Sequence, residues 1–196
     1  MVMTGHSAPD ATMTAIPRVI AARADGMTTI GVALKVPEPW ATQVRAARES
    51  LGDPQANCIP THVTLIAPAD IPMHSLPAID AHLTAVSQEC SAFRIQLRGT
   101  ATFRPVSPVV FIAVVDGISG CERIEKAVRR GPLLRRRRFP YHPHVTLVHN
   151  MPDDVLDKAF ADYEDFTATF AVDQLSLYQQ DAEGTWHPIK DYRLQA

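Results

Sequence analysis

The chain has 196 residues, of which 46% are hydrophobic and 20% charged, and its formal net charge is -2. This composition is typical of a globular protein with one domain or two small fused lobes, and it excludes a disordered chain or a membrane protein. The balance of charge also excludes nucleic-acid binding through a global positive field, so any such preference must come from a local patch. Three widely spaced cysteines (Cys58, Cys90 and Cys121) without a Cys-x-x-Cys pair indicate reduced thiols and a cytoplasmic protein.

The first 26 residues carry no apolar periodicity. Arg18 and Arg23 interrupt the continuous apolar run that a signal peptide needs. We therefore expect residues 1–26 to be a disordered N-terminal tail and residues 27–196 to form the folded domain.

From residue 28 onward the pattern alternates between strands and helices. In the first half, a β-branched apolar run predicts a buried strand over residues 29–36, and apolar residues at a spacing of three or four predict a helix from about 39 to 51. A strand over 61–67, a helix that opens at 74 or 75 and an alternating strand over 93–104 complete this half.

The second half repeats this order. Its expected elements are a strand over 109–115, a helix from 118 to about 130, a strand over 144–149, a helix from 153 or 154, an alternating strand over 167–179, and a last strand within 184–194. Both halves thus have the order βαβαβ. We expect an α+β fold with two related lobes, about 28–104 and about 109–194, that share a cleft.

One tetrapeptide occurs in both halves: His62-Val63-Thr64-Leu65 returns 82 residues later as His144-Val145-Thr146-Leu147. On a strand, the period of two places the His and the Thr of each copy on one face and the Val and Leu on the other. An imidazole can accept or donate a proton near neutral pH, and a hydroxyl can donate a hydrogen bond to a phosphate oxygen. Two such pairs therefore predict a site that grips one anionic group from both sides.

In this hypothesis His62 and His144 are catalytic, and Thr64 and Thr146 bind the substrate phosphate. The alternative is two core histidines with satisfied hydrogen bonds, next to threonines that are simply good strand residues. The duplication favours catalysis.

The two His-x-Thr-x motifs, with an apolar residue at each x, resemble those of the 2H phosphoesterase superfamily, which includes the 2'-5' RNA ligase and cyclic phosphodiesterase family. The resemblance covers roughly residues 28 to 194. It implies two pseudo-symmetric lobes around a central cleft, and a metal-independent phosphodiesterase that acts on 2',3'-cyclic phosphate or 2'-5' bonds of RNA or nucleotides, with ligation as the reverse reaction. It also favours His62 as acid and His144 as base, on which the residues themselves are silent.

A run of basic residues precedes the second motif. Eight basic residues lie between Arg123 and Arg138, and the last four are consecutive: Arg135, Arg136, Arg137 and Arg138. A solvated loop is the ordinary interpretation of such a run, but a loop that leads into His144 is also where a polyanionic substrate would gain attraction. Phe139, Tyr141 and Phe103 are candidates for stacking on a base, with core packing as the alternative for each.

The segment His142-Pro143-His144 is an alternative metal motif, because two histidines at i and i+2 can bind one ion. A metal site usually needs a third and a fourth ligand, and neither motif strand contains Asp or Glu. We therefore expect no metal and no cofactor.

The expected partner is an RNA terminus or a cyclic nucleotide, with no membrane, and the expected state is a monomer. The alternative function is an RNA- or nucleotide-binding module that performs no chemistry. The two titrating histidines argue against it, because a binding module needs phosphate donors and not two titrating groups.

Overall fold

The structure, a computed structural model, describes residues 19–196. Its eight strands form one antiparallel sheet in the order β6-β3-β4-β5-β2-β1-β7-β8. The strands are β1 Met27–Lys35, β2 His62–Pro72, β3 Phe93–Thr102, β4 Val109–Asp116, β5 His144–His149, β6 Thr167–Val172, β7 Gln174–Gln180 and β8 Trp186–Arg193. The helices are α1 Trp40–Ser50, α2 Leu76–Glu89, α3 Ile118–Val128 and α4 Asp153–Asp162, with short 3₁₀ turns at Met73–Ser75 and Gly131–Leu133. This architecture confirms the α+β class.

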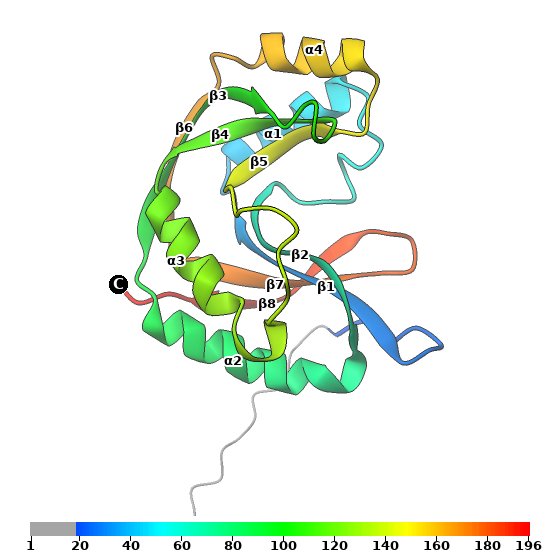
Figure 1. Cartoon of the computed structure of the whole chain (residues 1–196), viewed down its shortest axis with the longest axis vertical. Coiled ribbons are helices and arrows are strands. Elements are labelled where there is room, and N and C mark those ends of the chain that lie inside the picture. Colours follow the sequence, from blue (N-terminus) through cyan, green and yellow to red (C-terminus); the bar gives the residue numbers. More distant parts are fainter. Residues whose placement is uncertain (1–18) are drawn as a thin grey trace, which may run out of the picture.

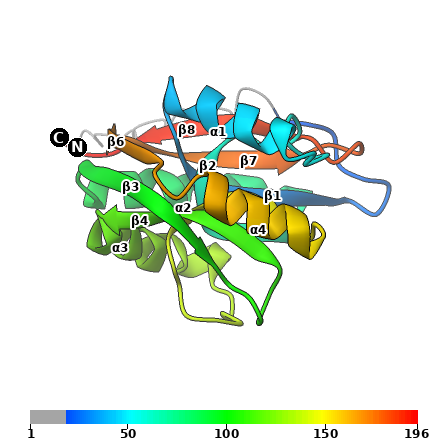
Figure 2. The same cartoon turned by 90° about the horizontal axis from the view of Figure 1, so that it is seen from above.

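The sheet is strongly curled, and the helices lie against it (Figure 1). Helices α2 and α3 pack on each other, and His82 Nε2 lies 2.9 Å from the Val128 carbonyl oxygen between them. Helix α4 contacts β3, β4 and β5, while α1 contacts β5. Figure 2 shows the same curl from above, with the loop that follows β3 and the loop that precedes β5 extending to the same side.

Each half of the sheet contains four strands, one of which carries a motif. Each half also takes its strands from both halves of the sequence. Strand β3 pairs with β4 and β6, whereas β7 pairs with β1 and β8. The expected lobes of about 28–104 and 109–194 therefore do not describe the spatial halves. The expected single strand over 167–179 is also wrong: it is interrupted at Asp173, where the chain leaves β6 at one edge of the sheet and enters β7 on the other side.

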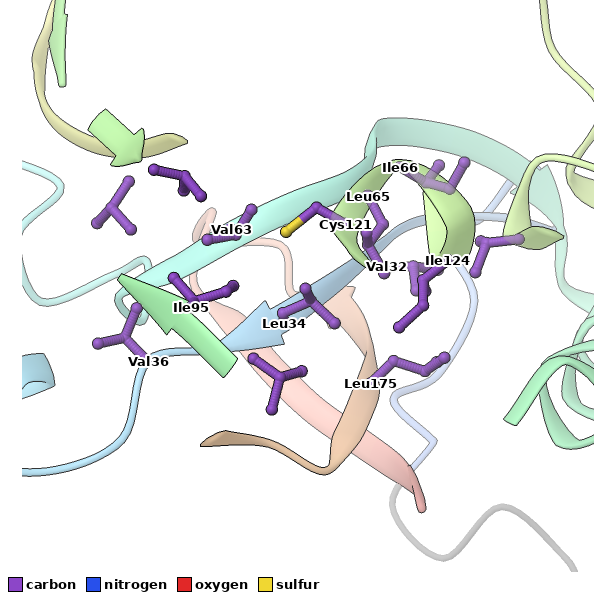
Figure 3. Packing of buried hydrophobic residues seen from close by; sticks show 14 of the residues in the cluster. Val32, Leu34, Val36, Val63, Leu65, Ile66, Ile95, Cys121, Ile124 and Leu175 are labelled. Atoms are coloured by element: carbon purple, nitrogen blue, oxygen red, sulfur yellow. The ribbon is translucent and has the colours of Figure 1, made fainter. Parts of the chain in front are cut away.

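The apolar residues of the two motifs lie in the core. Val63, Leu65, Val145 and Leu147 are each at most 1% exposed. Figure 3 shows Cys121 and Ile124 of α3 directed into the same cluster as Val63 and Leu65. A register slip by one residue would exchange these side chains with the His and Thr of each motif, so core packing determines which face of the sheet carries the histidines. The three cysteines are free thiols, and burial raises the pKa of Cys121 to about 12.

The chain contacts the sheet earlier than expected. The Ile20 N–H donates to Gln179 Oε1 at 2.7 Å, and Gln179 Nε2 donates to the Ile20 carbonyl at 2.8 Å. Arg23 forms an ion pair with Asp70 at 3.1 Å. Residues 19–26 thus pack against β7 and β2, and the rest of the predicted disordered tail, residues 1–18, lies outside the described residues.

Within residues 19–196, no helix combines the length and the apolar character needed to cross a membrane.

Candidate active site

The two motif strands meet at the centre of the sheet. Strands β2 and β5 are antiparallel neighbours, and Val63 lies opposite Val145. Extending this register by one residue in each direction places His62 across from Thr146 and Thr64 across from His144, all on the same face. The four predicted site residues line one pocket of about 470 Å³.

The wall of this pocket comes from helix α1, six strands and the connecting loops. Its other residues are Gly31, Val32, Ala33, Arg48, Ile59, Pro60, Thr61, Ile66, Pro68, Phe103, Ser107, Val109, Phe139, His149, Asn150, Tyr178 and Trp186. Gly31 leaves room for an aromatic wall, because a Cβ at this position would lie 3.2 Å from the Trp186 ring. Most of the pocket surface is apolar, and its polar residues lie both on the two motif strands and on other elements, as Arg48, Ser107 and Asn150 do.

The two histidines are held in the same way. His62 Nδ1 lies 2.6 Å from the Pro60 carbonyl oxygen, and His144 Nδ1 lies 2.7 Å from the His142 carbonyl oxygen. Because a carbonyl oxygen only accepts, Nδ1 carries the proton of each neutral ring and donates it to this bond. Nε2 of each ring is then free to take up or release a proton, and His62 Nε2 lies 3.1 Å from Thr64 Oγ1.

Both imidazoles favour the neutral form. Burial lowers the pKa of His62, and the positive charge of Arg48 lowers it further, against the opposing effect of the Pro60 carbonyl. Burial also lowers the pKa of His144; the His142 carbonyl opposes this, and the charges of His142 and His62 add to the lowering. A bound phosphodiester would act in the opposite direction, since its negative charge favours an imidazolium. The site is thus suited to hold one proton between two bases when an anion is bound.

Two aromatic rings that pack on each other lie on one side of His144. The centroids of Phe103 and Phe111 each lie 5.0 Å from that of His144, and the two phenyl rings are 4.3 Å apart. Phe111 is only 2% exposed and sits on β4 opposite Thr146. Phe103 also lines the pocket, so its ring contacts the candidate catalytic residue His144 at the pocket wall.

His142 does not share a metal site with His144 among the described residues. Its ring packs on Phe103 and Phe111, with centroid distances of 5.7 and 5.5 Å. Within residues 19–196, no three His, Cys, Asp or Glu side chains are grouped so that they could hold an ion. His142 contributes to the position of His144 through its carbonyl group, which accepts the Nδ1–H bond.

The four consecutive arginines do not act as one unit, and none of them lines the pocket. Arg135 donates to the Asp70 carbonyl at 3.0 Å. Arg137 donates through Nε to the fully buried carboxylate of Glu125 at 3.0 Å, and Arg129 binds the same carboxylate at 2.6 Å. Arg135 and Arg137 therefore anchor the loop, and the expected binding of substrate by the run stays a prediction.

All four arginines are exposed, and the two aromatic residues that follow them differ in their contacts. The Arg138 guanidinium lies 5.2 Å from the Phe139 ring centroid, and Phe139 is 55% exposed while lining the pocket. Tyr141 instead packs against the core, and its hydroxyl donates to the Thr64 carbonyl at 3.1 Å. The expected contact of Tyr141 with substrate is therefore not supported, and Tyr141 supports β2.

Sequence reasoning missed Arg48. It lies on the apolar stripe of α1, four residues after Val44 and three before Leu51, and it is only 4% exposed. A single arginine within an apolar helical stripe is the signal that would have singled it out, because a buried charge needs partners.

A curled antiparallel sheet that brings two His-x-Thr strands together at one pocket defines a 2H phosphoesterase. A family model described as the 2'-5' RNA ligase superfamily matches residues 36–184, so the chain belongs to that superfamily.

The individual relatives agree with this assignment. A protein of Bacillus cytotoxicus, provisionally named a phosphoesterase, is 24% identical over 146 residues, which cover 72% of this chain and 83% of that protein. Escherichia coli LigT in complex with 3'-AMP superimposes with a TM-score of 0.67 at 20% identity, covering 87% of this chain and 99% of LigT. The protein TT0787 of Thermus thermophilus gives 0.54 at 22% identity, covering 86% and 98%. At these identities the solved structures establish the fold.

Proposed function

We propose that this protein is a metal-independent phosphodiesterase that acts on 2',3'-cyclic phosphate or 2'-5' phosphodiester bonds of RNA or nucleotides. The observation that carries the proposal is the matched pair of imidazoles at one pocket, each with its Nδ1 bonded to a carbonyl and its Nε2 available. These two groups supply both proton transfers of a hydrolysis, so the proposed reaction needs no further proton carrier.

The proposed reaction places the phosphorus atom between the motif strands. The hydroxyls of Thr64 and Thr146 donate hydrogen bonds to the nonbridging oxygens, where negative charge increases as the reaction proceeds. One neutral imidazole removes a proton from the attacking water through Nε2, and the new bond joins the water oxygen to phosphorus. The other imidazole, protonated at Nε2, donates its proton to the leaving ribose oxygen as its bond to phosphorus breaks. A cyclic phosphate is thus converted to a phosphomonoester.

Ligation is the same exchange in reverse. A ribose hydroxyl, deprotonated by the imidazole that was the acid, attacks the phosphorus of the phosphomonoester, and the other imidazole protonates the oxygen that leaves as water, so the two imidazoles exchange their roles. The residues are the same in both directions, so the concentrations of RNA ends and of product determine which direction proceeds.

The surroundings of the motif strands support a nucleotide as substrate. The volume of about 470 Å³ is within the range of small-molecule pockets, and aromatic side chains (Phe103, Phe139, Tyr178 and Trp186) form part of its wall. Phe139, with Arg138 beside it, lies where a pocket wall meets solvent. We propose that Phe139 stacks on a base and that the exposed Arg136 and Arg138 attract the backbone of a longer RNA. The solved complex of the fold relative LigT with 3'-AMP is consistent with this substrate class.

The direct test is turnover of a panel with EDTA present: 2',3'-cyclic mononucleotides, 2'-5' dinucleotides and matched 3'-5' dinucleotides. We expect turnover of the first or second group, and a loss on the order of 10²-fold or more in His62→Gln and in His144→Gln. A protein that binds these compounds in titration calorimetry but turns over none of them would instead be the non-catalytic binding module.

A further inference from the structure

Arg48 is a buried cation at the wall of the pocket. Each nitrogen of its guanidinium has an acceptor: Nε donates to Asp53 Oδ2 at 2.9 Å, Nη1 to the Ile59 carbonyl at 2.8 Å, and Nη2 to the Gln55 carbonyl at 3.0 Å. All three acceptors belong to the loop between α1 and β2. The planar fork of an arginine suits this task, because its donors have fixed relative directions.

Asp53 completes the connection. It is 7% exposed, its Oδ1 accepts the Gln55 N–H at 2.9 Å, and its own N–H donates to the Arg48 carbonyl at 3.0 Å. A buried ion pair of this kind is weak evidence for stability, since apolar residues of similar volume are often as stable. The arrangement therefore calls for a reason other than stability.

The loop that Arg48 holds ends at His62. Ile59, whose carbonyl receives Nη1, is followed by Pro60, whose carbonyl receives the Nδ1–H of His62 at 2.6 Å. Thr61 is also fastened to α1, through a bond from its hydroxyl to the Ala41 carbonyl at 3.1 Å. The orientation of the His62 ring thus depends on a loop whose backbone is fixed from α1.

We propose that Arg48 is a positioning residue for His62, which it orients by fixing the carbonyl groups of the loop that holds the imidazole. This inference rests on the proposed function of His62 as an acid or base. It goes beyond that function because it assigns the orientation of one histidine to a residue outside both motifs.

The charge of Arg48 supports the same role. A guanidinium stays charged throughout the working pH range, so it disfavours a second positive charge on His62. Within residues 19–196, the groups that face His62 include His144 on β5 and Lys35 on β1, which is paired with Asp191 on β8 at 2.7 Å. His144 has no equivalent arginine among the described residues and packs on Phe103 and Phe111 instead. The two histidines therefore share the Nδ1–carbonyl bond, but only the loop that holds His62 is fixed by a buried arginine.

The test uses two variants of Arg48. The double variant Arg48→Met/Asp53→Asn removes the cation without leaving an unpaired buried carboxylate, and Arg48→Lys keeps a charge but cannot form the three directed bonds. Lys190→Met/Asp80→Asn serves as the matched control, because this pair at 2.6 Å is also largely buried and neither residue lines the pocket. Thermal unfolding verifies that each variant is folded, and Arg48→Lys is the decisive variant if the double variant is not.

Two readouts distinguish positioning from a structural role. On a 2',3'-cyclic nucleotide we expect kcat to fall about 10- to 100-fold in both Arg48 variants with KM changed less than about threefold, and the control to remain near wild type. In NMR titrations without substrate we expect the His62 midpoint to rise towards its ordinary value in the double variant, and to rise less in Arg48→Lys.

Three outcomes would overturn the proposal. An unchanged kcat and His62 titration with a lowered Tm would make Arg48 structural, and a rise in KM alone would make it a direct substrate ligand. An unchanged His62 titration in both variants would also overturn it, even if the wild-type protein turned over no phosphodiester, so this result is distinguishable from failure of the proposed function.

Discussion

Val63 lies opposite Val145 where β2 meets β5. The position of this pair brings each histidine across from the threonine of the other motif. If the site works as proposed, the four side chains act on one phosphorus atom, so their substitutions should not behave as independent changes.

The two histidines should be strongly non-additive. We expect His62→Ala and His144→Ala each to reduce kcat by on the order of 10²–10⁴, because each removes one of two coupled proton transfers. The double variant should be little worse than either single one. Single-turnover rates on a cyclic nucleotide measure this, and effects that multiply in the double variant would contradict a shared step.

The threonines should contribute less. Thr146→Val keeps the shape of the strand and removes one donor to the phosphate, so we expect a loss of about 10- to 10³-fold in kcat/KM. Thr64→Val also removes the hydroxyl that lies 3.1 Å from His62 Nε2, whereas Thr64→Ser retains a hydroxyl and is the matched control. A Thr64→Ser enzyme as slow as Thr64→Val would show that the hydroxyl is not the relevant group.

The pH profiles should differ between free and bound enzyme. Burial lowers the pKa of His62 and His144, so the bell-shaped kcat/KM profile of the free enzyme should have its maximum below about 6.5, the ordinary histidine pKa. The negative charge of bound substrate raises both pKa values, so the maximum of kcat should lie at higher pH. Steady-state kinetics from about pH 5 to 9 would measure both, and a kcat maximum at the lower pH would contradict this account.

The same shifts predict how stability depends on pH. The unfolded chain binds protons on these histidines more readily than the folded chain, so the free energy of unfolding rises with pH through this range. The contribution of the two groups is fully present above about pH 6.5 and is lost as pH falls from there through their folded pKa values. Denaturant unfolding at several pH values should show a flatter dependence in His62→Gln/His144→Gln than in wild type.

The arginine run should separate into two pairs. Arg136→Gln/Arg138→Gln should raise KM for an oligonucleotide and flatten its salt dependence, with a smaller effect on a mononucleotide and no change in Tm. Arg135→Gln/Arg137→Gln removes one of the two arginines bound to the buried Glu125 carboxylate, and it should lower stability by about 1–3 kcal/mol. Identical salt dependence for wild type and Arg136→Gln/Arg138→Gln would show that these two arginines are solvated loop residues and do not attract the substrate.

Truncation should distinguish the two parts of the N-terminal segment. A chain that begins at Val19 keeps every contact described above, so we expect unchanged stability and activity. A chain that begins at Met27 should remain active, but the buried Gln179 side chain loses its bonds to Ile20, at a cost of about 1–3 kcal/mol. Equal unfolding midpoints for the two truncations would show that the Ile20–Gln179 contact contributes nothing.

The sequence by itself determined the repeated motif, the strand that carries each copy, and which side chains of each copy share a face. This was possible because the period of a strand is local: His62 and Thr64 are two residues apart, and their relation does not depend on the rest of the chain. The helices around 40–50, 76–89 and 118–128 followed from the same kind of local periodicity.

Only the tertiary structure decided which strands lie together and which polar groups find partners. The alternating pattern over 167–179 conceals the break at Asp173, because both segments are suited to strands and only their pairing, with β3 and with β1, separates them. The contacts of Arg137 and Tyr141 could not be predicted for a similar reason: their partners, Glu125 and the Thr64 carbonyl, are distant in sequence. Such contacts depend on where the curled sheet places remote segments, and local periodicity carries no information about that placement.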